Sequence, residues 1–355
     1  MIRGDSRFQP GVQPSTHRSI RVPPAIRSPD VGSPSIRLEA DLHSSRQRGR
    51  IACGKLSISH QHCLNLKVRL SGNLFYRRIQ VTEIAQSVPC LQNFKLTLAY
   101  DGTEFSGWQV QPGEITVQGE LRAALGRITG ESPLPQGSGR TDAGVHALGQ
   151  VASFALQAPI PPGNLQRALN RTLPASIRIL ETLPVPSTFH ARHSAVAKTY
   201  EYRVFRGEIC PPFLARYVHA CPWPMDLAAM NLAASDFLGQ HDFLSFAATD
   251  PDLASRTAFA EAYEKPDQLL AVRTIYSSAW EERQTESGNL LVYRVRGSGF
   301  LHHMVRNLVG TMLDVGRGRL SAGSIPEILA ARARAAAGPT APAQGLFLHS
   351  VEYGK

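Results

Sequence analysis

The sequence has few cysteines, and they are not arranged as a scaffold. Five cysteines occur among 355 residues, with irregular spacing and no Cys-x-x-Cys pair. Disulfide frameworks and zinc knuckles need closely or regularly spaced cysteines, so neither is indicated. Such a composition is typical of proteins from a reducing compartment, and we therefore expect a cytoplasmic protein.

Membrane segments and nucleotide-binding motifs are missing as well. No apolar run approaches the ~20 residues of a membrane helix, and the N-terminus lacks the apolar stretch of a secretory signal. No Gly-x-x-x-x-Gly-Lys-Ser/Thr motif occurs, and in two runs that resemble Gly-x-Gly-x-x-Gly the last glycine is replaced by Asp142 and by His302. Neither a membrane nor ATP nor NAD is implied.

Metal-binding patterns are weak. His302 and His303 are adjacent within an expected helix, where neighbouring side chains diverge by ~100° around the axis. His60, His62 and Cys63 lie in an N-terminal region without other signs of structure, and no His-Glu-x-x-His occurs. We expect no metal site.

Basic residues are distributed unevenly. Residues 1–92 hold 14 of the 38 Lys and Arg but only 5 of the 28 Asp and Glu. This part is rich in Ser, Pro and Arg and shows no sustained helical or strand period, which predicts a mostly disordered extension. The remaining chain is nearly neutral, so the net charge of +10 says little about the folded part.

Two explanations of the extension compete. Its Arg- and Ser-rich, acid-poor start is compatible with an organellar transit peptide. Alternatively, no methionine occurs between Met1 and Met225, so a gene that starts at a non-ATG codon near residues 81–91 would have been read from too far upstream. We favour the second explanation, because regular structure is expected to begin just after these residues.

From residue 93 onward, strand and helix patterns alternate. Apolar alternation predicts strands over 94–100, 149–156, 176–181, 197–207 and 289–299, and helical spacing predicts helices over 117–129, 164–173, 225–239 and 300–316. Thr116 is the expected N-cap of the first helix, and Gly130 is its expected end. The pattern predicts an α+β fold with two similar sheet-and-helix subdomains, residues 93–197 and 198–355, which meet at a cleft.

The loop Gln136–Ala147, QGSGRTDAGVHA, contains a candidate reactive carboxylate. An aspartate in a glycine-rich loop is usually a turn or capping residue. Here the loop's glycines let the backbone pass close to another object, and Arg140 is able to hold a carboxylate ionised or to bind a phosphate. These neighbours favour Asp142 as a reactive group that faces a polyanionic substrate.

Two further residues have both a structural and a functional interpretation. Tyr200 shares a strand face with Tyr202 and Val204, which favours ordinary packing, but a tyrosine at the start of a strand also suits stacking on a base. Arg306 lies in an otherwise apolar helix, where its guanidinium needs an anion. That anion is either a structural carboxylate or the reactive one.

Five motifs, in this order, resemble the tRNA pseudouridine synthase A family. They are AYDGTEFSGWQVQP, TVQGEL, GSGRTDAGVHALGQVASF, FHARHSAVAKTYEYRV and GSGFLHHMVRNLVGTMLDVGRG, and the similarity spans about residues 93–355. The resemblance implies the pseudouridine synthase fold and isomerisation of uridine to pseudouridine at positions 38–40 of the tRNA anticodon stem-loop. It also implies a homodimer that needs no cofactor.

The resemblance assigns roles to four residues. Asp142 matches the family nucleophile, and Arg140 matches an arginine with a part in flipping the target uridine out of its helix. Tyr200 matches the tyrosine that stacks against the target base, and Arg306 matches the basic residue that pairs with the aspartate. Residues 1–92 match nothing in the family, and a longer connection over 247–271 is expected to reshape one edge of the RNA-binding cleft.

Three other functions remain open at this point. A non-catalytic RNA-binding module would use the same cleft but would not need Asp142. A pseudouridine synthase for another RNA would keep all four residues. An aspartate-dependent glycosidase would need a second carboxylate as acid, and none lies near Asp142 in the sequence. Attack on the sugar and attack on the base are both compatible with these residues.

Overall fold

The computed structural model describes residues 63–70, 73–80, 91–248, 271–286 and 288–354. Chain contacts divide the protein into two units, Met1–Gln86 and Ser87–Lys355. In the first unit, β1 (Cys63–Leu70) pairs with β2 (Asn73–Gln80) in an antiparallel hairpin that the sequence did not lead us to expect. The rest of the first unit lies outside the described residues. So do residues 81–90 of the region where we favour the translation start, and residues 249–270 of the connection 247–271.

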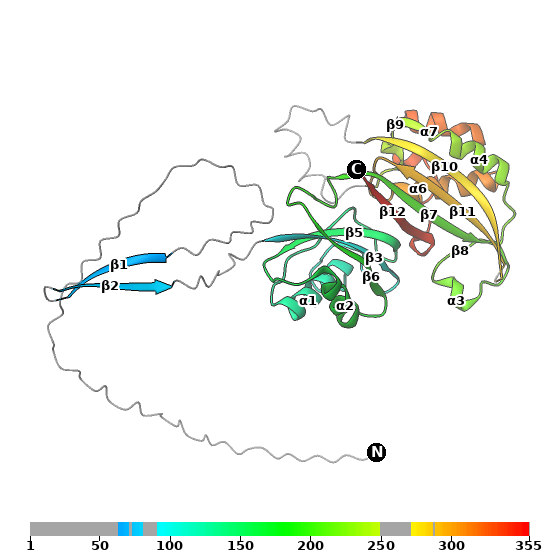
Figure 1. The fold of residues 1–355 in the computed structure, drawn as a ribbon. Coiled ribbons are helices and arrows are strands. Elements are labelled where there is room, and N and C mark those ends of the chain that lie inside the picture. The colour runs from blue at the N-terminus through cyan, green and yellow to red at the C-terminus, as the bar shows by residue number, and fades with distance from the viewer. Residues whose placement is uncertain (1–62, 71–72, 81–90, 249–270, 287, 355) are drawn as a thin grey trace, which may run out of the picture. The chain divides into compact units, whose positions relative to one another are not determined.

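The second unit is built on one mixed sheet of ten strands in the order β6-β3-β5-β12-β7-β11-β10-β9, with β4 on β5 and β8 on β7 (Figure 1). The strands are β3 (Gln92–Tyr100), β4 (Gln136–Gly137), β5 (His146–Leu156), β6 (Ile177–Val185), β7 (Ala195–Phe205), β8 (His219–Ala220), β9 (Gly239–Asp242), β10 (Val272–Thr285), β11 (Gly288–Gly297) and β12 (Leu346–Tyr353). The α+β class is confirmed.

The last strand joins the two halves. β12 pairs parallel with β5 of the first half and antiparallel with β7 of the second, so the halves share a continuous sheet. The expected boundary between residues 197 and 198 falls inside β7. The division into two subdomains therefore stays a prediction, and the sheet itself has no break at that point.

Helices pack against each half of the sheet (Figure 1). α1 (Val117–Thr129) and α2 (Pro162–Thr172) belong to the first half, whereas α3 (Pro212–Ala215), α4 (Leu227–Ser235), α6 (Met304–Gly316) and α7 (Ile325–Ala331) belong to the second. α1 has the predicted ends, because Thr116 accepts the N–H of Gly119 and Gly130 adopts a φ of 75°. Within the described ranges, no helix is both long and apolar enough to cross a bilayer.

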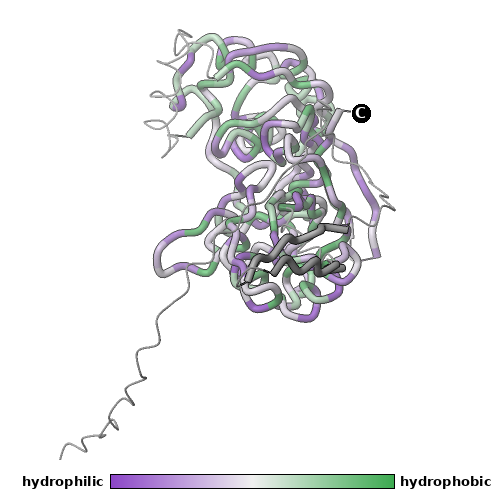
Figure 2. The backbone as a smooth tube through the Cα atoms, turned by 60° about the vertical axis from the view of Figure 1, so that its left-hand side comes forward, coloured by the Kyte–Doolittle hydropathy of each residue, from purple (hydrophilic) through white to green (hydrophobic). Residues whose placement is uncertain are grey.

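A hydrophobic core extends through both halves. One cluster of buried side chains contains Phe94 and Leu121 of the first half as well as Tyr293 and Met312 of the second. Hydrophobic and hydrophilic stretches alternate along the backbone of both halves (Figure 2). Because the core and the sheet are both continuous, each half fixes the position of loops that belong to the other.

Candidate active site

Hydrogen bonds and close packing against Gln150 and Trp108 fix the glycine-rich loop between β4 and β5. Buried Gln150 of β5 accepts the Ser138 hydroxyl at 2.6 Å and donates to the Gly139 carbonyl at 2.9 Å. The backbone N–H of Trp108 donates to the Thr141 carbonyl at 3.0 Å. A Cβ at Gly137 would lie 2.6 Å from the Trp108 ring, so only glycine allows the loop to pack this closely. These contacts fix the backbone that carries Asp142.

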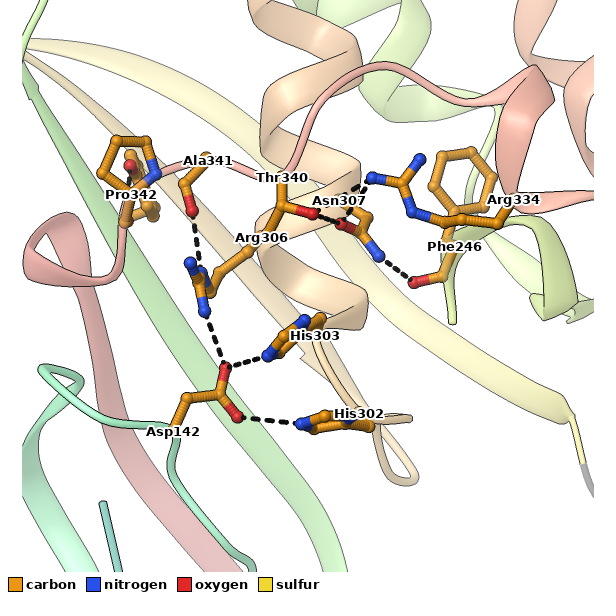
Figure 3. A network of polar contacts seen from close by, with 11 residues as sticks. Asp142, Phe246, His302, His303, Arg306, Asn307, Arg334, Thr340, Ala341 and Pro342 are labelled. Carbon is orange, nitrogen blue, oxygen red and sulfur yellow. Dashed lines mark hydrogen bonds and ion pairs between the residues drawn. The ribbon is translucent and has the colours of Figure 1, made fainter. Parts of the chain in front are cut away.

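Asp142 meets three basic side chains from the start of α6 (Figure 3). Nη1 of Arg306 donates to Oδ2 at 3.1 Å, Nε2 of His303 lies 3.4 Å from the same oxygen, and Nε2 of His302 lies 3.6 Å from Oδ1. The side chains of Asp142 and Arg306 are only 20% and 16% exposed, so water screens this pair weakly. Asp142 and Arg306 therefore lie together, as the family resemblance implies.

Arg306 is itself anchored. Its Nε donates to the Ala341 carbonyl at 2.7 Å, while its own carbonyl accepts the Ala341 N–H at 3.0 Å. One turn away, a Cβ at Gly310 would lie 1.6 Å from the Pro339 carbonyl oxygen, so α6 and the segment before β12 touch through their backbones. The guanidinium consequently reaches Asp142 from a fixed position.

Buried Asn307 adds a second attachment of the same helix. Its Nδ2 donates to the Phe246 carbonyl at 2.7 Å, and its Oδ1 accepts from Arg334 at 3.1 Å and from the Thr340 hydroxyl at 2.7 Å (Figure 3). An amide that uses both ends in this way has little freedom to rotate. Asn307 thus orients the turn of α6 that presents Arg306.

The expectation that His302 and His303 diverge is wrong. α6 begins at Met304 instead of residue 300, because His303 adopts a left-handed backbone with a φ of 58°. The two rings consequently lie side by side, with centroids 4.0 Å apart, and both point at Asp142. No sequence signal indicates this arrangement, since residues other than glycine rarely adopt positive φ.

These residues also form the one group among the described side chains whose geometry would suit a metal ion. The ligand atoms of Asp142, His302 and His303 all lie within 4.8 Å of one another. Arg306 already contributes positive charge at the same carboxylate, which disfavours a second cation. Burial, opposed by Asp142 and reinforced by His302, Arg306 and Arg334, lowers the pKa of His303, so its imidazole is neutral near pH 7.

Tyr200 lies in the wall of the same site. It is 7% exposed and makes an edge-on contact with Phe300, with ring centroids 5.0 Å apart. Burial, with added effects of Tyr100 and the Asp142 charge, raises the pKa of its hydroxyl well above the usual range. The side chain therefore presents a neutral aromatic surface near Asp142.

A cleft of about 380 Å³ opens above Asp142. Tyr200 and the exposed Arg140 line it, so all four residues that the resemblance assigned lie in or beside one site. Arg192 and Lys198 add positive charge to the walls. The volume falls in the range of small-ligand sites, which suits one nucleoside and excludes a duplex.

Lys198 was missed from the sequence, although a signal for it exists. Residues two apart on a strand share a face, so Lys198 and Tyr200 of β7 point the same way. Its Nζ donates to the Ser138 carbonyl at 2.6 Å, within the loop that carries Asp142. Burial, together with nearby Arg192 and Arg273, lowers the pKa of this amine to about 8.

The fold and the site define an α+β protein in which a fixed carboxylate lies at the base of a cationic cleft. A family model described as tRNA pseudouridine synthase matches residues 97–194 and 233–354. The tRNA pseudouridine synthase A of Solibacter usitatus is 50% identical over 264 residues, which are 74% of this chain and all of the relative. That of Moorella thermoacetica is 45% identical over 268 residues, which are 75% of this chain and all of the relative. The chain belongs to the tRNA pseudouridine synthase family.

Proposed function

We propose that this protein is an isomerase that converts uridine to pseudouridine at positions 38–40 of the tRNA anticodon stem-loop, with Asp142 as nucleophile. The observation that carries the proposal is the ion pair between Asp142 and Arg306 at the base of the cationic cleft. The 50% identity to a tRNA pseudouridine synthase A supports tRNA as the substrate.

The reaction needs an accessible nucleotide. A uridine in a stem must leave the base stack before a protein side chain reaches its glycosidic bond, at a cost of a few kcal/mol. The cleft accommodates one extruded nucleoside, and the Tyr200 ring, held by Phe300, offers it a stacking surface. The exposure of Arg140 on the same loop supports a contact between its guanidinium and the backbone from which the uridine is extruded.

The chemistry uses one carboxylate. The bond between C1′ of the ribose and N1 of uracil breaks, Asp142 holds the reacting fragment as a covalent adduct, and the base turns. A bond from C1′ to C5 then forms, Asp142 departs, C5 loses its proton and N1 gains one. Attack on the sugar and attack on the base both use the same carboxylate, which accepts a hydrogen bond from Arg306. Because there is no net redox change, the isomerisation needs no redox cofactor.

The test is to incubate the purified protein with unmodified tRNA and to map new pseudouridines along the whole chain. We expect them at positions 38–40. Pseudouridine elsewhere, or only in another RNA, would assign the enzyme a different substrate. Release of free uracil would indicate a glycosidase, and tight binding without any product would leave an RNA-binding module.

We further propose that the enzyme acts in the cytoplasm as a homodimer. Both assignments rest on the family resemblance, and the free thiols of Cys210 and Cys221 are compatible with a reducing compartment. Light scattering coupled to gel filtration measures the assembly directly: twice the chain mass supports the dimer, and one chain mass rejects it.

A further inference from the structure

Lys198 occupies an unusual position for a lysine. It lines the cleft that contains Asp142, yet its Nζ donates to a backbone carbonyl, that of Ser138. An ammonium group has three donors, so the Ser138 carbonyl uses one of them. In the described part of the chain, no carboxylate forms an ion pair with Lys198.

The surroundings of Lys198 favour an anion. Among the described residues, Arg192 and Arg273 are the charged groups that lower the pKa of Lys198, and both are cations. A partly desolvated ammonium beside two guanidinium groups is destabilised by burial and by repulsion. A negatively charged ligand in the cleft would relieve both effects, because it would pair with Nζ and neutralise part of the local charge.

The loop that carries Asp142 leaves room for the Lys198 amine beside Gly139. A Cβ at Gly139 would lie 3.1 Å from Nζ, which is tighter than nine in ten real Cβ contacts, so a side chain there would shift the amine by a few tenths of an ångström. Lys198 contacts the loop at Ser138, four residues before Asp142. A ligand bound to Nζ would therefore have a defined position relative to the Asp142 carboxylate.

We propose that Lys198 binds a backbone phosphodiester next to the target uridine and so sets the register of that nucleotide against Asp142. The proposal deepens the proposed function and rests on it for the identity of the substrate. RNA supplies a singly charged phosphodiester at every linkage, and Nζ reaches one of them when the nucleoside enters the cleft. Lys198 is thus a substrate-positioning residue, distinct from the nucleophile.

The decisive experiment combines two changes. Anticodon stem-loops are synthesised with an uncharged methylphosphonate at one linkage at a time around the target, and are tested with wild type, Lys198→Met and Lys198→Arg. With the wild-type enzyme, a methylphosphonate at one particular linkage should lower kcat/KM by about 10- to 100-fold, which is the loss expected when a hydrogen bond to a charged group is removed. Lys198→Met should show that loss with ordinary RNA and no further loss when the same linkage is neutral.

The same comparison is repeated with RNA affinity as the measured quantity, and every variant in it also carries Asp142→Asn. If Lys198 binds the phosphate, Lys198→Met and the sensitive methylphosphonate should weaken RNA binding non-additively. Additive losses at every linkage would overturn the proposal and leave Lys198 as a tether for Ser138. A wild-type enzyme that binds RNA with this pattern but forms no pseudouridine would reject the proposed function while retaining the phosphate site.

The pH profile gives an independent readout. The charged amine binds phosphate, so wild-type kcat/KM should be highest below the Lys198 pKa of about 8 and should fall as pH rises through it. Arg192 and Arg273 stay charged throughout this range. Lys198→Arg should restore part of the activity lost in Lys198→Met and should lack the alkaline decline. An alkaline decline that persists in Lys198→Arg would contradict the assignment.

Discussion

Replacing Arg306 by methionine tests the contact on which the site depends. Methionine is similar in length and suits the apolar surroundings of α6, so the change removes charge with little change of volume. Asp142 would lose the donor at 3.1 Å, and the Ala341 carbonyl would lose its donor at 2.7 Å. The histidines would remain the basic groups at the carboxylate.

The structure sets the expected size of the effect. Exposed ion pairs contribute ~0.2–1 kcal/mol, and removal of one partner of a fully buried pair costs ~3–5 kcal/mol. Side-chain exposures of 16% for Arg306 and 20% for Asp142 place this pair between those limits. We expect a coupling of about 2 kcal/mol, which corresponds to a loss of about 30-fold if it acts on the transition state alone.

Two assays separate stability from catalysis. Urea unfolding of Arg306→Met, Asp142→Asn and the double variant should give this coupling of about 2 kcal/mol, and all three proteins should remain folded. Single-turnover isomerisation by Arg306→Met should fall by at least about 30-fold, with Arg306→Lys between it and wild type because one ammonium cannot reach both Asp142 and Ala341. A coupling near zero, or an Arg306→Met enzyme of normal rate, would show that the arginine serves another partner.

The remaining predictions concern the wall of the cleft, the helix contact, the N-terminal region and metals. Tyr200→Phe keeps a stacking face and should lose less single-turnover activity than Tyr200→Leu; equal losses would point to the hydroxyl. Gly310→Ala should lower the free energy of unfolding by at least about 2 kcal/mol, because its Cβ would meet the Pro339 carbonyl; an unchanged melting temperature would contradict that contact. Deletion of residues 1–90 should leave melting temperature, rate and target positions unchanged at near-physiological salt, since β3 begins at Gln92, and a loss would mean that these basic residues hold tRNA. Treatment with EDTA should leave the rate unchanged, because the reaction is redox-neutral and Arg306 already pairs with Asp142; inactivation reversed by a divalent ion would refute this.

Local signals in the sequence predicted elements whose ends depend on local chemistry. Thr116 and Gly130 bound α1 because a side-chain cap and a left-handed glycine act within one turn. The pairing of β12 with β5 was not predictable in this way, because it joins segments far apart in the chain. The hairpin of β1 and β2 was overlooked because its apolar alternation is short and lies in a polar, basic region.

In the site, too, local features were predictable from the sequence pattern and contacts between distant segments were not. The apolar setting of Arg306 required an anion without naming it; the family resemblance implied Asp142, and the two side chains form an ion pair in the folded chain. The position of Lys198 was available from the two-residue period of the strand that contains Tyr200. The convergence of His302 and His303 was not available, because it depends on a positive φ at His303, a backbone conformation that residues other than glycine rarely adopt.

The central claim is that the Asp142 carboxylate performs the isomerisation. The most direct measurement compares wild type with Asp142→Asn on unmodified tRNA, with pseudouridine mapping and RNA affinity recorded on the same preparations. We predict pseudouridine at positions 38–40 with wild type and none with Asp142→Asn, at affinities within a few-fold, because phosphate contacts supply most of the binding. Turnover by Asp142→Asn above about a tenth of the wild-type rate, where losing a nucleophile should cost orders of magnitude, would contradict it.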